Sequence, residues 1–305
     1  MNDILQSVIC SNRCWTSKGK VATYIPELSK GNPDALGIYV ITCNGEEYSF
    51  GDFETKFTIQ SISKVVTLMC VLHDYGKEKV FQKVSVEPTS DAFNSIINLE
   101  AKNFHKPLNP MINAGAIATV SMLNGNTPKE KFCRVLKFMR ELAGNANIDL
   151  NENVYLSEKI TGHRNRALAH FMKSTNIMDG NVEDILDVYF KLCSIEITCK
   201  DIAKIGAVLA NNGVLPWNKK RLIAKETAKI VKAIMTTCGM YDASGEFSVS
   251  VGIPAKSGVG GGILAVVPNR MGIGVIGPSL DQKGNSIAGI KVLEELNKKL
   301  NLSIF

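Results

Sequence analysis

The segment from Phe57 to Lys64 holds a serine and a lysine three positions apart, in the pattern S-x-x-K. Ser61 and Lys64 stand where a stripe of apolar residues at helical spacing begins, so we expect both on one face at the start of a helix. A lysine that burial keeps uncharged can accept the serine proton and make that oxygen a nucleophile. Free backbone N–H groups at a helix start can also stabilise a developing oxyanion. The spacing therefore indicates a serine nucleophile with a lysine base.

The motif alone does not decide between this chemistry and a plain helix start with a solvated lysine. Ser17 and Lys20 satisfy the same spacing in a segment without signs of a helix start. The interpretation thus needs a second motif that reaches the same site.

Such a motif is K-S-G at residues 256–258, which lies between two predicted strands. It resembles the K-T-G element that accompanies S-x-x-K in penicillin-binding proteins and β-lactamases. The glycines that follow let the backbone approach a ligand closely, and the Val259 N–H is a candidate oxyanion donor. The alternative is a glycine-rich bulge at a strand bend.

Strands are predicted at both ends of the chain and helices between them. Residues 35–42 and a run through Tyr48 and Phe50 form a hairpin around Asn44-Gly45, and residues 247–253, 263–267 and 271–276 form later strands. Residues 58–237 have mainly helical spacing, and 287–300 form a final helix. We expect an α+β fold, with an antiparallel sheet from both chain ends flanked by helices and a helical part inserted.

The whole chain, 1–305, is expected to be one catalytic domain. Its α/β part spans about 1–60 and 238–305, its helical part about 61–237, and the cleft lies where the two meet.

Composition excludes several other classes of protein. Apolar residues make up 45% of the chain, and the net charge of +6 comes from lysines scattered among acids, so nucleic-acid binding is not expected. No segment has the apolar length of a membrane span, and the first twenty residues lack a secretory core. The eight cysteines include no C-x-x-C pair, which favours reduced thiols in the cytoplasm and no metal site.

Six blocks resemble signatures of the serine-dependent glutaminases, in family order from about Val21 to Pro268. They are residues 24–28, 59–64, 109–117, 157–158 with 164–168, 238–242 and 254–259. The resemblance implies a β-lactamase-like fold and hydrolysis of L-glutamine to L-glutamate and ammonia through an acyl-enzyme. It implies no metal or organic cofactor, and a homo-oligomer, either dimer or tetramer.

The resemblance also assigns roles to individual residues. Ser61 would be the nucleophile and Lys64 its base, Tyr241 would relay the proton to ammonia, and the N–H groups of Ser61 and Val259 would form the oxyanion hole. The amino-acid end of glutamine would be held by Tyr24, Asn113, Glu158, Asn165 and Tyr189, with Gln60 close by.

These roles suit free glutamine, whose ammonium needs an acid and whose carboxylate needs neutral donors. Without the resemblance, Glu158 would be read as a first-turn acid, the asparagines as helix caps and Tyr189 as core.

Three competing hypotheses remain. A penicillin-binding or β-lactam-hydrolysing enzyme would share both motifs, but no S-D-N block is evident. A catalytically silent glutamine sensor would share the pocket. A Ser/His/Asp triad is disfavoured because none of the four histidines, at 73, 105, 163 and 170, stands beside the serine in a motif.

Overall fold

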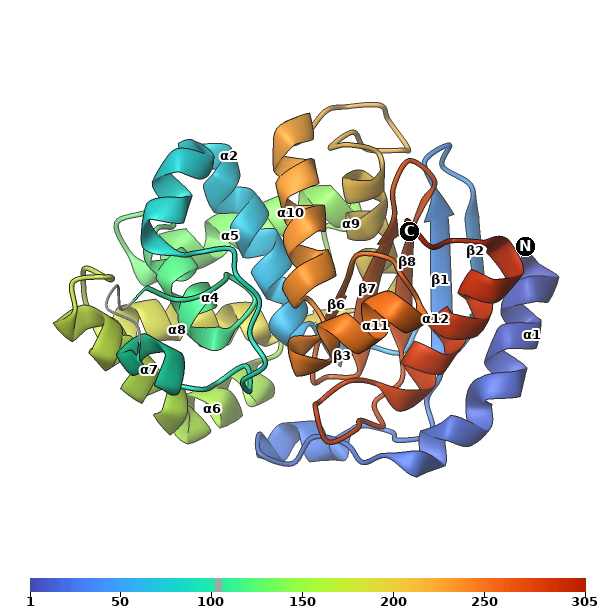
Figure 1. Ribbon diagram of the computed structural model, residues 1–305, viewed down its shortest axis with the longest axis horizontal. Helices are drawn as coiled ribbons and strands as arrows, with labels where there is room; N and C mark the ends of the chain where they lie inside the picture. Colours follow the sequence, from blue (N-terminus) through green and yellow to red (C-terminus); the bar gives the residue numbers. More distant parts are fainter. Residues whose placement is uncertain (102–105) are drawn as a thin grey trace.

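A five-stranded antiparallel sheet forms the centre of one side of the molecule (Figure 1). The computed structural model describes residues 1–101 and 106–305. The strand order β2-β1-β8-β7-β6 makes strands from the two chain ends neighbours. Their bounds are Gly37–Thr42 (β1), Glu47–Gly51 (β2), Ala255–Ser257 (β6), Gly262–Val267 (β7) and Met271–Ile276 (β8). The prediction of a mixed fold, with an antiparallel sheet built from both chain ends, is confirmed.

Helices cover both faces of this sheet. Alternate residues such as Val40 and Ile273 pack against α1 (Asn2–Asn12) and α12 (Ile287–Leu300), which run side by side in Figure 1. The opposite face packs against α9 (Cys199–Ala210). A Cβ on Gly272 would lie only 2.1 Å from the Ala207 nitrogen, so α9 rests directly on the backbone of β8.

Of the remaining helices, α2 and α4 to α8 form a second group beside the sheet, in the left half of Figure 1, whereas α11 packs through Phe247 into the core of the sheet. Their bounds are Ser63–Lys83 (α2), Ile97–Ala101 (α3), Asn113–Ser121 (α4), Pro128–Ala143 (α5), Glu152–Thr161 (α6), His163–Ser174 (α7), Val182–Cys193 (α8), Lys225–Cys238 (α10) and Ser244–Ser250 (α11). A small sheet joins β3 (Phe57–Thr58), β5 (Ile195–Ile197) and β4 (Asp149–Leu150). Within residues 1–101 and 106–305, no helix is both long and apolar enough to cross a bilayer.

The structure corrects two expectations near the C-terminal strands. Residues 247–253, predicted as a strand, lie largely in α11, which continues a 3-10 turn at Tyr241–Ala243. The Ser244 hydroxyl bonds the backbone of that turn, and Val249 is 91% exposed, so the alternating pattern there marks no buried sheet face. The K-S-G residues Lys256 and Ser257 lie within the edge strand β6 and not between two strands.

Candidate active site

Ser61 lies in a 3-10 turn, Gln60–Ile62, that leads directly into α2. The Ile59 N–H donates to the Ile195 carbonyl at 2.8 Å and ties this turn to β5. Gln60 has φ of 48°, a left-handed conformation that costs a residue with a side chain about 1–2 kcal/mol. The bend is thus held by tertiary contacts and places the serine at the helix start.

The glycine-rich segment after β6 packs against the backbone of this serine turn. A Cβ on Gly258 would lie 2.8 Å from the Ile59 oxygen, and one on Gly260 would lie 2.4 Å from the Thr58 oxygen. Both positions therefore admit only glycine without displacement of the backbone. Val259 stands between them, which brings its N–H to the same end of α2 as the serine.

Lys64 is a buried amine, 2% exposed, one turn after Ser61. Its Nζ donates to the Met111 carbonyl at 3.1 Å and to Asn113 Oδ1 at 2.7 Å. Burial lowers the pKa of Lys64 to about 8, although nearby Cys193 and Glu158 act in the opposite direction. Among the described contacts, Lys64 Nζ forms no hydrogen bond with Ser61.

The partners of Lys64 suit the uncharged amine. A neutral amine has two N–H donors and one lone pair, and its two donors match the two acceptors at Met111 and Asn113. The lone pair is then left free to accept a proton.

Tyr241 also lies close to Ser61. Its φ of 56° is again left-handed. Its hydroxyl is buried and forms no hydrogen bond of ordinary geometry with any described residue. Burial raises the pKa of Tyr241, while the nearby Ser61 hydroxyl and Val259 N–H oppose that rise. The phenol oxygen of Tyr241 therefore lies near both the Ser61 hydroxyl and the Val259 N–H.

Two side chains fix the ring of Tyr241. The Phe93 ring centroid is 4.8 Å from that of Tyr241, and Lys256 Nζ is 4.3 Å from the Tyr241 centroid. Lys256 is fully buried and donates to the carbonyls of Gly239 at 3.0 Å and Ser257 at 2.7 Å. Burial and then the nearby Lys64 lower the pKa of Lys256 well below its usual value.

A pocket opens beside Ser61. Its lining includes seven of the residues predicted for the site: Tyr24, Gln60, Ser61, Asn113, Glu158, Asn165 and Tyr189. The other three, Lys64, Tyr241 and Val259, lie next to this lining and are joined to it through Asn113 and Ser61. The structure thus brings residues from the N-terminal segment, the inserted helices and the C-terminal strands to one place.

Glu158 gives the pocket its negative charge. It is 6% exposed and, among the described residues lining this pocket, is the one acid. Burial raises the pKa of Glu158 to about 8, although a hydrogen bond with Gln60 and the charge of Lys64 oppose the shift. Because its ionised form has no salt bridge within the described chain, a bound cation would stabilise it strongly.

Neutral polar groups surround this acid. Asn113 Nδ2 donates to Asn165 Oδ1 at 2.9 Å, so one amide contacts both Lys64 and the second asparagine. Tyr189 is 4% exposed, and burial raises the pKa of its hydroxyl. The Tyr24 residue as a whole is 55% exposed, while desolvation of its hydroxyl and then the nearby Tyr241 raise its pKa. Both phenols therefore stay protonated and can donate to an anion.

Seven further residues line the pocket but were not predicted for the site: Ile25, Phe93, Asn94, Thr161, Gly162, Arg164 and Cys193. Arg164 Nε donates to the Asn94 carbonyl at 2.9 Å and holds that segment over α7. Cys193 is one helical turn after Tyr189, so helical periodicity could have found it. Phe93 and Asn94 lie outside any periodic segment, and no sequence signal marks them.

The histidines do not contribute to this pocket. Neither His73, His163 nor His170 lines it, and His105 lies outside the described residues. In the part of the chain that the structure describes, no cluster of three or more His, Cys, Asp or Glu side chains could hold a metal ion.

Comparisons with known proteins point to one family. Residues 19–305 match the family described as Glutaminase. A glutaminase from Clostridium botulinum (strain Kyoto / Type A2) is 66% identical over 305 residues, which is 100% of both chains. The crystal structure of a probable glutaminase from Bacillus subtilis has a TM-score of 0.93 at 42% identity and covers 99% of this chain and 96% of that one.

A further solved structure is the covalent complex of a B. subtilis glutaminase with 5-oxo-L-norleucine, formed by reaction with 6-diazo-5-oxo-L-norleucine. It has a TM-score of 0.91 at 41% identity and covers 99% of this chain and 98% of that one. These superpositions confirm the β-lactamase-like fold.

Proposed function

Since this chain belongs to the glutaminase family and hydrolyses L-glutamine to L-glutamate and ammonia, we propose that the reaction runs through an acyl-enzyme on Ser61. The observation that carries the proposal is the buried Lys64 amine one turn after a serine at a helix start, beside a pocket with one buried acid. Lys64, Tyr241 and Val259 complete the reacting centre.

In the first step, Ser61 Oγ attacks the side-chain amide carbon of glutamine. The serine proton passes to uncharged Lys64, directly or through the Tyr241 hydroxyl. The carbonyl oxygen becomes an oxyanion that the N–H groups of Ser61 and Val259 stabilise. Support comes from the position of Tyr241, whose oxygen is near both Ser61 and the Val259 N–H.

Collapse of the tetrahedral intermediate breaks the carbon–nitrogen bond. The leaving nitrogen takes the proton back through Tyr241, and ammonia departs. Water then attacks the glutamyl ester, gives up a proton to the same base, and releases glutamate with Ser61 restored. Glutamine and one water molecule are the only reactants that these steps consume.

Glutamine would bind with its amino-acid end in the pocket. Ionised Glu158 would pair with the α-ammonium, and Asn165 with the phenols of Tyr24 and Tyr189 would donate to the α-carboxylate. Gln60 and Asn113 line the same pocket and contact Glu158 and Asn165, respectively. Asparagine is one methylene shorter, so with this end anchored its amide would fall short of Ser61.

One assay tests these roles: ammonia release from glutamine and asparagine, and hydrolysis of a reporter β-lactam, by the wild type and by Ser61→Ala. We expect activity on glutamine, asparagine turnover lower by roughly 10–200-fold, none on the β-lactam and near-complete loss in the variant. Normal glutamine turnover by Ser61→Ala would refute the nucleophile. β-Lactam hydrolysis would favour the competing acyl-serine function.

We propose further that residues 1–305 form one catalytic domain, assembled from the α/β part (about 1–60 and 238–305) and the inserted helical part (about 61–237). Pairing of β1 with β8 supports this division. We also propose a cytoplasmic homo-oligomer, dimer or tetramer. The eight unpaired thiols are consistent with a reducing compartment, and light scattering of the purified protein tests the assembly.

A further inference from the structure

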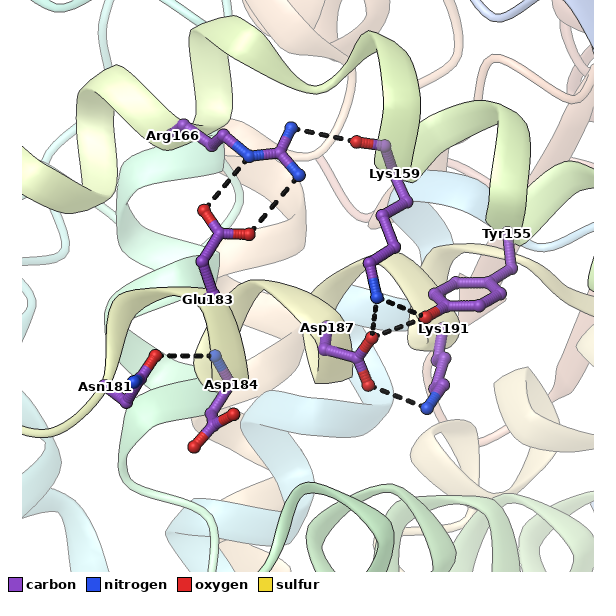
Figure 2. Close-up of polar contacts among 8 residues, drawn as sticks. All are labelled: Tyr155, Lys159, Arg166, Asn181, Glu183, Asp184, Asp187 and Lys191. Carbon is purple, nitrogen blue, oxygen red and sulfur yellow. Dashed lines mark hydrogen bonds and ion pairs between the residues drawn. The ribbon is translucent and has the colours of Figure 1, made fainter.

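Three helices that carry pocket residues are tied together by a polar network next to the pocket (Figure 2). Glu158 is on α6, Asn165 on α7 and Tyr189 on α8. The residues of the network, which we call the brace, are Tyr155, Lys159, Arg166, Glu183, Asp187 and Lys191.

Asp187 is the centre of the brace. Its Oδ1 accepts from the Tyr155 hydroxyl and from Lys159 Nζ, the latter at 2.8 Å, and its Oδ2 accepts from Lys191 Nζ at 2.7 Å. Tyr155 and Lys159 belong to α6, so these bonds join α6 to α8. Burial alone would raise the pKa of Asp187, but the three donors outweigh it and lower the pKa to about 2.

Arg166 adds the third helix. Its guanidinium pairs with Glu183 of α8 at 3.0 Å and donates to the backbone carbonyl of Lys159 at 2.8 Å. Figure 2 shows the resulting contacts among α6, α7 and α8.

The brace residues are close in sequence to the pocket residues. Lys159 follows Glu158, Arg166 follows Asn165, and Asp187 is two positions before Tyr189. Residues one or two apart on a helix point about 100–200° away from one another. Each helix therefore directs one side chain into the pocket and a neighbouring side chain into the brace.

We propose that Asp187 is a positioning residue for substrate recognition: by linking α6 to α8 it holds Glu158 at the distance from Tyr189 that lets Glu158 reach the α-ammonium of glutamine. This inference rests on the proposed binding role of Glu158. Asp187 touches neither the substrate nor the reacting atoms, so it acts on affinity more than on chemistry. A carboxylate that shifts by a fraction of an ångström loses much of a charge-assisted hydrogen bond.

The test compares Asp187→Asn with Asp184→Asn as the matched control. Both carboxylates are on α8 and both variants remove one charge, but Asp184 is exposed and its side chain lies outside the brace. We expect Asp187→Asn to raise KM for glutamine about tenfold while kcat changes less than threefold, and Asp184→Asn to leave both unchanged. An unchanged KM in Asp187→Asn would overturn the proposal.

Two inhibitors separate positioning from a general loss of structure. Glutamate carries the ammonium, whereas glutarate keeps both carboxylates without it. Asp187→Asn should raise the inhibition constant of glutamate and leave that of glutarate nearly unchanged. Equal losses for both inhibitors would mean that the brace only supports the fold. Lys159→Met removes the α6 partner of Asp187, so it replaces Asp187→Asn in the same assays if Asp187→Asn does not fold.

A third variant distinguishes this inference from the proposed function itself. If Glu158→Gln leaves KM unchanged, the binding role of Glu158 fails, and the positioning role with it. If Glu158→Gln raises KM but Asp187→Asn does not, only the positioning role fails. If Asp187 acts through Glu158, the double variant should have a KM no higher than Glu158→Gln alone.

Discussion

The pH dependence of turnover offers a detailed test of the reacting centre, because two buried groups must both lose a proton. Lys64 has its pKa lowered by burial to about 8, and Glu158 has its pKa raised by burial to about 8. Lys64 must be uncharged to act as the base, and Glu158 must be ionised to bind the ammonium. Bound substrate already holds Glu158 ionised, so kcat reports Lys64, whereas kcat/KM reports both groups in the free enzyme.

The expected magnitudes follow from these pKa values. About one Lys64 in eleven is uncharged at pH 7 and about half at pH 8, so kcat should rise about fivefold over that interval. If the two groups titrate independently, kcat/KM should rise by the square of this factor, about thirtyfold, and coupling between them reduces that figure. Glu158→Gln removes one titration, so the rise in kcat/KM should fall to about fivefold.

Direct quantification of released ammonia between pH 6 and pH 8.5, at saturating and at limiting glutamine, measures both parameters. The wild type should show a steeper acid limb in kcat/KM than in kcat, and Glu158→Gln should make the two limbs parallel. The assignment is refuted if the Glu158→Gln limb stays as steep as that of the wild type, or if kcat is flat from pH 6 to pH 8.

Further predictions concern single variants. Tyr241→Phe should lower kcat by roughly 10²–10⁴-fold with a KM change of only a few-fold in steady-state assays, since the proton relay is lost and the ring is kept; a kcat near that of the wild type would exclude the relay. Lys64→Met should be inactive yet raise the thermal midpoint at pH 7. The pKa of Lys64 is lower in the folded protein than in the unfolded chain, so burial of the charged amine destabilises the fold below about pH 8. This destabilisation disappears as the pH rises toward the unfolded pKa. The difference in thermal midpoint between Lys64→Met and the wild type should therefore shrink between pH 8 and pH 10. Gly115→Ala should reduce the free energy of unfolding in urea by about 2–3 kcal/mol, because its Cβ would lie 1.9 Å from the Asn109 oxygen; no change would mean that α4 moves freely there.

Much of the sheet could be predicted because its pattern depends on local chemistry. The Asn44-Gly45 turn marks the first hairpin, and the helix at 287–300 has the bounds that its periodicity predicted. The strand prediction for residues 247–253 failed because Phe247 and Val251, four positions apart, are buried on one face of α11 and its end, whereas Val249 between them is 91% exposed. Alternation alone does not report whether a partner strand is present.

In the candidate site too, the features that depend on local spacing could be predicted, and those that depend on tertiary packing could not. The spacing of Ser61 and Lys64 could be read locally because one helical turn separates them. The hydrogen bond from Lys64 to Asn113 could not, since it depends on how α4 packs against α2. Phe93, which lies against Tyr241, leaves no local signal because tertiary contacts alone bring it there.

Covalent labelling tests the central claim most directly. The intact mass of the full chain is measured after reaction with 6-diazo-5-oxo-L-norleucine, the reagent named for the B. subtilis complex, and the modified peptide is then sequenced by fragmentation. We predict a single adduct, with the mass of the reagent less dinitrogen, on Ser61, and none in Ser61→Ala. An adduct on another side chain, such as the pocket thiol of Cys193, or undiminished labelling of Ser61→Ala, would contradict the account.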